Sequence, residues 1–335
     1  MSRTYSVTRE KMVEEAKRRG WSIAYFGPDD FFYEIITTDG RHSLFRGSSP
    51  QTAPWIGGYI CKHKLYSLEY LEHIGITPPP FSLFADDVSA QKFLQDHSRI
   101  VVKPENSEQS KGVTVDITDM AALREAVATA REFSSQIILQ KQLEGQLYRL
   151  LTVGGTFCAA AVRTAPFIIG DGQRTILALI DEKNGHPLRG EASTSPLKTI
   201  KVTEVALYLA SKGQSLEDIP MLDEQVTLGP IASVSAGGEA ADITDQVHQD
   251  YIDIAERISQ SLGLVTCGFD LMVADISKPL EGSFPMLEMN STPGLKIHYY
   301  PTAGGQPRNV AAAILDAAFP EQFVTSGNRP QKMVR

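Results

Sequence analysis

The sequence predicts a mixed α/β fold of the α+β type, with two larger lobes and, in addition, a small amino-terminal α/β lobe. The 335 residues suit two or three lobes of about 100 to 150 residues each. Short apolar runs typical of strands alternate with segments of helical periodicity along the whole chain. A triplet, Pro78 to Pro80, stops regular structure and separates the first of these lobes from the rest.

Composition and charge narrow the class of protein. Hydrophobic residues make up 42% of the chain and charged residues 21%, which is typical of globular proteins and argues against disordered, collagen-like and coiled-coil chains. The net charge of −8 disfavours binding to nucleic acid. No apolar run approaches the roughly 18 to 20 residues of a membrane span, and the charged amino terminus is unlike a signal peptide. We therefore expect a cytoplasmic protein that binds neither nucleic acid nor membrane.

Residues 1–78 are expected to form the small α/β lobe. Thr8 to Arg19 has apolar positions at helical spacing, Trp21 to Phe26 is typical of a strand, and Lys64 to Ile74 is typical of a helix.

Residues 79–145 are expected to form a second, compact lobe. Its order is strand, polar loop, strand, Ala-rich helix and strand, at Ile100 to Lys103, Glu105 to Lys111, Val113 to Ile117, Met120 to Glu132 and Ile137 to Gln142.

Residues 146–325 are expected to form the third lobe, with a mostly polar insertion at about 170–228, and residues 326–335 a flexible tail. Two strands meet at a Gly154-Gly155 hairpin turn, and two buried strands, VTCGFDLMVAD and FPMLEMN, follow a long amphipathic helix. The helices expected here are Thr175 to Lys183, Val205 to Lys212, Asp245 to Leu262 and Asn309 to Ala318.

Three oxygen-bearing side chains lie on the two buried strands. Glu288 and Asn290 are two residues apart and therefore share one face of their strand. Asp270 lies among apolar residues of the preceding strand, where an isolated carboxylate would be costly to bury. Two carboxylates and an amide oxygen suit Mg²⁺. The alternative is that Asp270 and Glu288 are ordinary paired acids.

Lys103 ends an apolar strand and precedes Pro104, so rigid backbone directs its ammonium group toward the loop SEQSKG. Small residues in that loop would let backbone amides approach phosphate oxygens. The alternative is a solvated corner. The Walker motif is absent.

The order of these motifs resembles the ATP-grasp superfamily, and within it the ligase domains of cyanophycin synthetase and bifunctional glutathione synthetase. The resemblance covers roughly Lys64 to Pro320. It is carried by RIVVKP, KGV, ILQKQLEG, YRLLTVGG, AAAVR, IIGDGQRTILALIDEKNGHPLRG, SVSAGGEAADIT, CGFDL, LEMNSTPGLKIH and GQPRNVAAAILDAAFP.

The resemblance implies roles at matching positions. ATP would be held by residues of the phosphate loop, the two lysines and the adenine hinge: Lys64, Lys103, Ser110, Lys111, Gly112, Gln140, Lys141, Gln142 and Leu143. Magnesium, as two ions, would be held by Asp270, Glu288 and Asn290. The substrates would meet Ser235, Gly237, Gly238, Ser291, Thr292, Pro293 and Gly294.

The resemblance also implies a reaction and partners. A carboxylate would attack the γ-phosphate of ATP, and an amine would capture the acylphosphate as an amide, releasing ADP and phosphate. The substrates would be small amino acids or peptides, the loop from Glu105 to Lys111 would be a lid, and the protein would form a homodimer.

The chain departs from the family at three places. Ser110 replaces a glycine, Leu147 replaces an acid expected near the ribose, and LGPIAS lacks an arginine. Because an unmatched oxyanion is costly, we expect Arg163 or Arg189 to act as the catalytic cation. The competing hypothesis is a degenerate ATP-grasp module that binds nucleotide without ligating. A hydrolase or dehydrogenase is disfavoured, since neither a nucleophile elbow nor a GxGxxG motif occurs.

Overall fold

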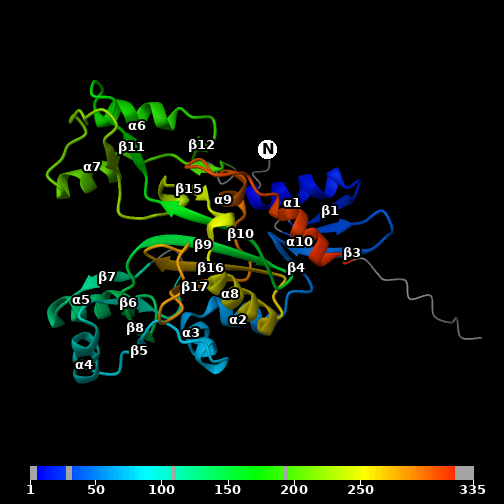
Figure 1. Cartoon of the computed structure of the whole chain (residues 1–335), viewed down its shortest axis with the longest axis horizontal. Helices are drawn as coiled ribbons and strands as arrows, with labels where there is room; N and C mark the ends of the chain where they lie inside the picture. Colours follow the sequence, from blue (N-terminus) through cyan, green and yellow to red (C-terminus); the bar gives the residue numbers. More distant parts are fainter. Residues whose placement is uncertain (1–5, 28–31, 108–110, 192–194, 321–335) are drawn as a thin grey trace, which may run out of the picture.

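The computed structural model describes residues 6–27, 32–107, 111–191 and 195–320. Three bodies of secondary structure surround a central sheet (Figure 1). An amino-terminal lobe lies on one side, and the insertion with α6 and α7 and the lobe with α4 and α5 lie on the other. In the described part of the chain, no helix is long and apolar enough to cross a membrane.

The amino-terminal lobe is a helix on a four-stranded antiparallel sheet. Its elements are α1 (Val7–Arg18), β1 (Ser22–Phe26), β2 (Phe32–Ile36), β3 (His42–Arg46) and β4 (Ser49–Pro50), in the order β1-β2-β3-β4. The Ser6 hydroxyl caps α1 by accepting from the Arg9 N–H. Tyr33, Ile35 and Phe45 alternate with outward residues and are buried in the core of this lobe.

The lobe that follows is a second antiparallel sheet, in the order β5-β8-β6-β7, covered by two helices. Its elements are β5 (Phe81–Leu83), α4 (Asp87–His97), β6 (Ile100–Pro104), β7 (Thr114–Ile117), α5 (Met120–Arg131) and β8 (Ile137–Lys141). Asp86 and Ser89 form a capping box at the start of α4. A core of Val, Leu, Ile and Ala joins the two helices to the sheet. We call this unit the lid sheet.

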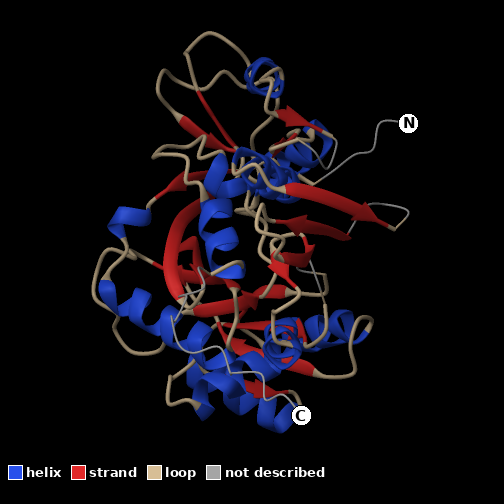
Figure 2. Cartoon of the chain, turned by 90° about the vertical axis from the view of Figure 1, so that its right-hand side faces the viewer, coloured by secondary structure: helices blue, strands red, loops and turns tan. Residues whose placement is uncertain are grey.

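The central sheet has five antiparallel strands in the order β15-β10-β9-β16-β17. These are β9 (Gln146–Val153), β10 (Thr156–Thr164), β15 (Glu239–Asp242), β16 (Thr266–Val273) and β17 (Met286–Asn290). Its long strands curve between the helices (Figure 2). The amphipathic helix α8 (Gln249–Leu262) packs on one face together with α2 (Trp55–Lys62) and α3 (Lys64–His73). On the other face, Leu151 and Val153 pack against α10 and the amino-terminal lobe.

The insertion folds around a small core of its own. Its elements are β11 (Phe167–Ile169), α6 (Ile176–Asn184), β12 (Arg189–Gly190), β13 (Leu197–Lys198), α7 (Val202–Ser211) and β14 (Gln225–Thr227). Strands β11 and β14 pair antiparallel, and Ile180, Ile200 and Leu209 fill the core between the helices. The chain then passes through short 3₁₀ turns at Val234–Ala236 and Thr244–Gln246.

Two helices close the described chain. Helix α9 (Lys296–Tyr299) packs on β10 and β15, and α10 (Val310–Ala318) packs on α1. Leu151, Leu295 and Leu315 share one core with the amino-terminal lobe. That lobe is therefore fused to the central sheet.

Candidate active site

Charged side chains gather on the face of the central sheet that α8 does not cover. In the register of the sheet, Asp270 of β16 lies opposite Arg149 of β9 on one side and opposite Glu288 of β17 on the other. Arg163 of β10 lies opposite Leu147, two residues before Arg149. Because side chains alternate along a strand, these positions share one face.

Asp270 is the centre of this cluster and is buried. Its Oδ1 accepts from Arg149 Nε and from Arg163 Nη2, the latter at 2.7 Å. Burial by itself would raise the pKa of Asp270, but the charges of Arg149 and Arg163 outweigh it and lower the pKa. The carboxylate is therefore held ionised, and each arginine is oriented by it.

Glu288 and Asn290 lie beside Asp270 on the last strand of the sheet. Asn290 Nδ2 donates to Glu288 Oε1 at 3.1 Å, and both side chains are half-buried. Two carboxylates and an amide oxygen on one open face fit Mg²⁺. The described residues contain no group of three or more His, Cys, Asp or Glu arranged for a metal, so the metal set would need the amide.

Lys103 brings the lid sheet to this face. Its buried Nζ donates to Gln140 Oε1 at 2.5 Å. Burial, and then the nearby charge of Lys64, lower the pKa of Lys103 to about 8, and Glu288 opposes them. Gln140 Nε2 is a buried donor with no partner within the described residues. A buried cation and an unpaired amide fit a polar ligand such as a nucleotide.

Lys64 lies at the start of α3 and reaches the chain that leaves β6. Its Nζ donates to the Ser107 carbonyl at 2.6 Å. The neighbouring His63 Nδ1 lies 2.9 Å from Glu105 Oε1. These contacts tie the beginning of the predicted lid loop to the helices beneath the central sheet.

The other residues predicted to bind nucleotide lie along the lid sheet and its exit. Ser110 lies outside the described residues, and Lys111 is exposed. Gly112 has φ +70°, and a Cβ there would come within 2.6 Å of Phe133. The Lys141 N–H donates to the Pro80 carbonyl at 2.8 Å. The Gln142 Oε1 accepts a hydrogen bond from the Asp116 N–H at 2.6 Å. Leu143 is half-buried in the connection to β9.

Ser291, Thr292, Pro293 and Gly294 follow β17 and are fixed from the amino-terminal lobe. Ser48 Oγ donates to the Pro293 carbonyl at 2.9 Å, and Thr266 Oγ1 donates to the Ser291 carbonyl at 2.9 Å. This segment is therefore a rigid wall beside Asn290.

Gly237 and Gly238 lie before β15. Gly237 has φ +88°, and a Cβ on Gly238 would overlap the Thr164 carbonyl. Both positions therefore require glycine. The side chain of Ser235 lies outside the described part.

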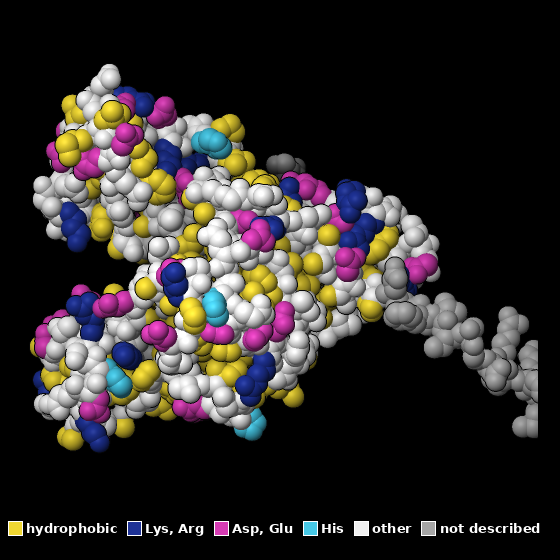
Figure 3. Space-filling view, viewed as in Figure 1, with side chains coloured by type: hydrophobic (Ala, Val, Ile, Leu, Met, Phe, Trp, Pro, Cys, Tyr) yellow, Lys and Arg dark blue, Asp and Glu magenta, His cyan; other side chains and the backbone are white. Residues whose placement is uncertain are grey.

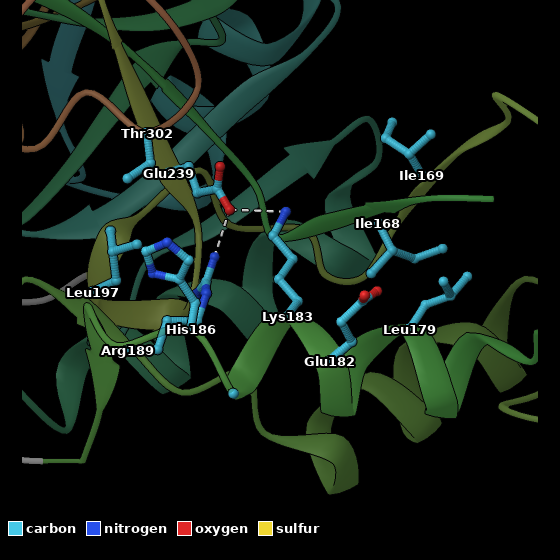
Figure 4. A pocket seen from close by; sticks show the side chains of 11 residues that line it. Ile168, Ile169, Leu179, Glu182, Lys183, His186, Arg189, Leu197, Glu239 and Thr302 are labelled. Atoms are coloured by element: carbon cyan, nitrogen blue, oxygen red, sulfur yellow. Dashed lines mark hydrogen bonds and ion pairs between the residues drawn. The ribbon is translucent and has the colours of Figure 1, made fainter. Parts of the chain in front are cut away.

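Arg189 lies in a polar network within the insertion (Figure 4). Its Nη1 donates to the carbonyls of Lys198 and Gly237, each at 2.8 Å, and its Nη2 to Glu239 Oε1 at 2.5 Å. Lys183 Nζ lies 2.8 Å from the same Glu239 oxygen. The network lines a cavity of about 520 Å³. These bonds engage the guanidinium group of Arg189, and its catalytic role stays a prediction.

Arg149, Lys296 and His298 were not expected in the site. Lys296 begins α9 and lies near Arg163 and Lys198. His298 is buried without a partner for either ring nitrogen within the described residues, and burial lowers its pKa to about 3. The segment YRLLTV has the pattern of a strand, so the sequence places Arg149 on one of its two faces. Only the register of the sheet shows that Arg149 lies opposite Asp270.

The described surface has a deep notch between the lid sheet and the insertion (Figure 3). The lid sheet carries Lys103 and the central sheet carries Asp270, Glu288 and Arg163. Lys103 and the Asp270 cluster therefore belong to different lobes.

Comparisons with known proteins find relatives of this chain. The chain is 30% identical over 317 residues to cyanophycin synthetase of Trichormus variabilis and 27% identical over 324 residues to the glutathione biosynthesis bifunctional protein GshAB of Mannheimia succiniciproducens. The matches cover 93% and 94% of this chain. The crystal structure of a bifunctional glutathione synthetase from Pasteurella multocida superposes with a TM-score of 0.75 at 24% identity, over 94% of this chain and 43% of that one.

The chain has the ATP-grasp fold. The expected fold class is thereby confirmed. No family model matches the sequence. This ATP-grasp chain spans 35% of the length of the cyanophycin synthetase and 43% of that of the bifunctional protein.

Proposed function

We propose that this ATP-grasp protein is an ATP-dependent carboxylate–amine ligase that forms an amide or peptide bond and releases ADP and phosphate. The observation that carries the proposal is the position of Lys103. A buried lysine of the lid sheet lies in the electrostatic field of Glu288 on the central sheet, across the boundary between the two lobes. A phosphate chain between them would meet a cation on one side and a metal-binding carboxylate on the other.

The reaction would need charge neutralisation and positioning more than a protein nucleophile. A carboxylate oxygen of one substrate forms a bond to the γ-phosphorus while the bond to ADP breaks. The amine nitrogen of the second substrate then attacks the acyl carbon, phosphate leaves with the carboxylate oxygen, and the nitrogen loses a proton. Bound Mg²⁺, as two ions held by Asp270, Glu288 and Asn290, would neutralise phosphate charge.

Lys64 and Lys103 would position the phosphates, and residues 140–143 would hold adenine. Arg163 would face the substrates together with Gly237, Gly238 and the wall at residues 291–294. We also propose that the substrates are small amino acids or peptides, that the protein acts in the cytoplasm, and that it forms a homodimer.

The test is ADP release with Mg²⁺ across pairs of the twenty amino acids and their dipeptides. Oxygen-18 in the donor carboxylate should appear in the released phosphate. Stoichiometric AMP in place of ADP would overturn the proposal, since it would indicate adenylation.

A second candidate is a nucleotide-binding module without ligase activity. The resemblance implies an acid where this chain has Leu147, and two arginines donate to one oxygen of Asp270. This candidate predicts that ATP raises the melting temperature of the protein while no pair of substrates releases ADP.

A further inference from the structure

The junction between α2 and α3 contacts the lid sheet through two consecutive side chains. His63 follows α2 and precedes Lys64, the first residue of α3. Its Nδ1 lies 2.9 Å from Oε1 of Glu105, the residue directly after β6, and Lys64 Nζ donates to the Ser107 carbonyl at 2.6 Å. Two neighbouring residues of the junction therefore hold the chain where it leaves β6.

His63 is oriented toward Glu105 and not toward its own helix. It is the N-cap residue of α3, a position whose side chain commonly accepts a hydrogen bond from the first turn, but it makes no such bond. Its ring lies between those of Tyr59 and Tyr66, with centroid distances of 4.3 and 5.6 Å. The two tyrosines therefore restrict the ring, and its Nδ1 is directed to Glu105.

Glu105 is buried and belongs to the lid sheet. Its backbone N–H donates to the Gln136 carbonyl at 2.9 Å, directly before β8. Within the residues that the structure describes, its carboxylate bonds only to His63. A buried carboxylate with one partner adds little stability, because desolvation offsets most of the attraction. What the bond positions is therefore a better explanation of the pair than the stability of the fold.

The bond joins the two backbone segments that carry Lys64 and Lys103. The charge of Lys64 helps to lower the pKa of Lys103, so the two ammonium groups lie within electrostatic reach of each other. Like charges repel, and one of these lysines comes from α3 and the other from β6. The bond between His63 and Glu105, one residue from Lys64 and two from Lys103, opposes their separation.

We propose that His63 and Glu105 are positioning residues, which hold Lys64 and Lys103 at the spacing that a phosphate chain requires. The inference rests on the proposed function, in which both lysines contact the phosphates of ATP. Without the bond, ATP would have to order the two segments when it binds, and that ordering would lower its affinity. The pair should therefore affect ATP affinity more than it affects folding.

The test is the double variant His63→Phe/Glu105→Leu. It replaces the pair by apolar side chains, and Phe keeps a ring between the two tyrosines. Because such a replacement commonly leaves stability unchanged or raises it, the variant should melt no more than about 3 °C below wild type. Its affinity for ATP with Mg²⁺, measured from the rise in melting temperature with ligand, should fall at least about tenfold. An affinity within about twofold of wild type would overturn the proposal, whatever the melting temperature.

A second variant tests whether the hydrogen bond or the ring is responsible. His63→Gln loses the ring but keeps an N–H donor for Glu105, so its ATP affinity should stay within about threefold of wild type. His63→Phe alone keeps the ring and loses the donor, and its affinity should fall at least about tenfold. Equal losses in these two single variants would assign the effect to the ring and overturn the proposal.

The matched control is a second His–Glu pair, on the surface of the amino-terminal lobe. His42 Nδ1 lies 2.6 Å from Glu34 Oε1, and His42→Phe/Glu34→Leu should leave ATP affinity within about twofold of wild type. A loss equal to that of the test variant would overturn the proposal. Stabilisation of the wild type by ATP without ADP release from any substrate pair would overturn the ligase function alone, because the binding experiment does not require turnover.

Discussion

At the residue scale, the site is a balance of buried charges. Asp270 holds two guanidinium groups, and removing it would leave both beneath the sheet surface with less compensation. Glu288 is half-buried and accepts a hydrogen bond from the Asn290 amide. Glu288 is therefore the better position at which to test the metal without disturbing the fold.

Glu288→Gln should lower turnover at saturating ATP by at least about a hundredfold, because it removes negative charge from the proposed Mg²⁺ site. The melting temperature should change little. Steady-state rates with Mg²⁺, beside a thermal melt, check this expectation, and an unchanged turnover number would refute the metal assignment. Glu182→Gln, on an exposed position of the insertion, controls for loss of one negative charge.

Lys103 should give ATP binding a pH dependence. Burial and the charge of Lys64 lower the pKa of Lys103 in the folded protein to about 8, from the ordinary lysine value of 10.5. It is therefore charged below about pH 8 and loses its charge above it. The kcat/KM for ATP, which reports groups of the free enzyme, should be level below about pH 8 and fall above it.

The lowered pKa of Lys103 affects stability in the opposite direction from ATP binding. Between about pH 8 and 10.5 the unfolded chain binds the proton and the folded chain does not, so the contribution of Lys103 to the free energy of unfolding rises with pH.

In Lys103→Arg the guanidinium stays charged, and the fall in kcat/KM near pH 8 should disappear. A fall that persists in this variant would assign it to another group.

At the element scale, the connection between the lid sheet and the central sheet is tightly packed. Gly145 joins β8 to β9 with φ +124°, and a Cβ there would overlap the backbone carbonyl of Val273. The chain crosses from one lobe to the other at this point, directly before the strand that carries Arg149.

Gly145→Ala should therefore lower the melting temperature and the affinity for ATP, because the two backbones must separate. Gly213→Ala is the matched control, since Gly213 has φ +73° and open space around its Cα. The control should cost only the left-handed backbone penalty of about 1 to 2 kcal/mol. Equal losses of stability in the two variants, measured by urea unfolding, would show that the contact with Val273 is easily relieved.

At the scale of the whole molecule, the amino-terminal lobe and the central sheet depend on one core. Leu315 of α10 is fully buried in that core beside Met12, Ile35 and Leu151. The same lobe fixes the wall that follows β17 through Ser48. Loosening this core should therefore affect the site as well as the fold.

Leu315→Ala should destabilise the protein by about 2 to 5 kcal/mol, whereas Leu207→Ala, at a position 77% exposed on α7, should stay within about 0.5 kcal/mol of wild type. Chemical unfolding followed by circular dichroism and by tryptophan fluorescence checks this, since Trp21 packs against this core. A small effect of Leu315→Ala would show that α10 is not integral to the fold.

Much of the lid sheet and central sheet could be predicted, because their strands are buried runs and their helices have clear periodicity. The expected strand at 100–103, helix at 120–132 and hairpin at 154–155 correspond to β6, α5 and the turn between β9 and β10. Strands β2 to β4 and helix α4 were missed. They are short or bury few side chains, as Ala90 and Leu94 in α4 show, so their patterns are weak.

The sequence by itself determined the fold class and the pairing of Glu288 with Asn290 on one face, because strand period and motif order can be read along the chain. Tertiary structure alone decided that Arg149 and Arg163 converge on Asp270, that Lys103 lies in the field of Glu288, and that Arg189 is bound to Glu239. Those contacts join residues 50 to 185 positions apart in sequence only through strand register and lobe packing. Charges that meet across such distances leave no periodic signal in the sequence.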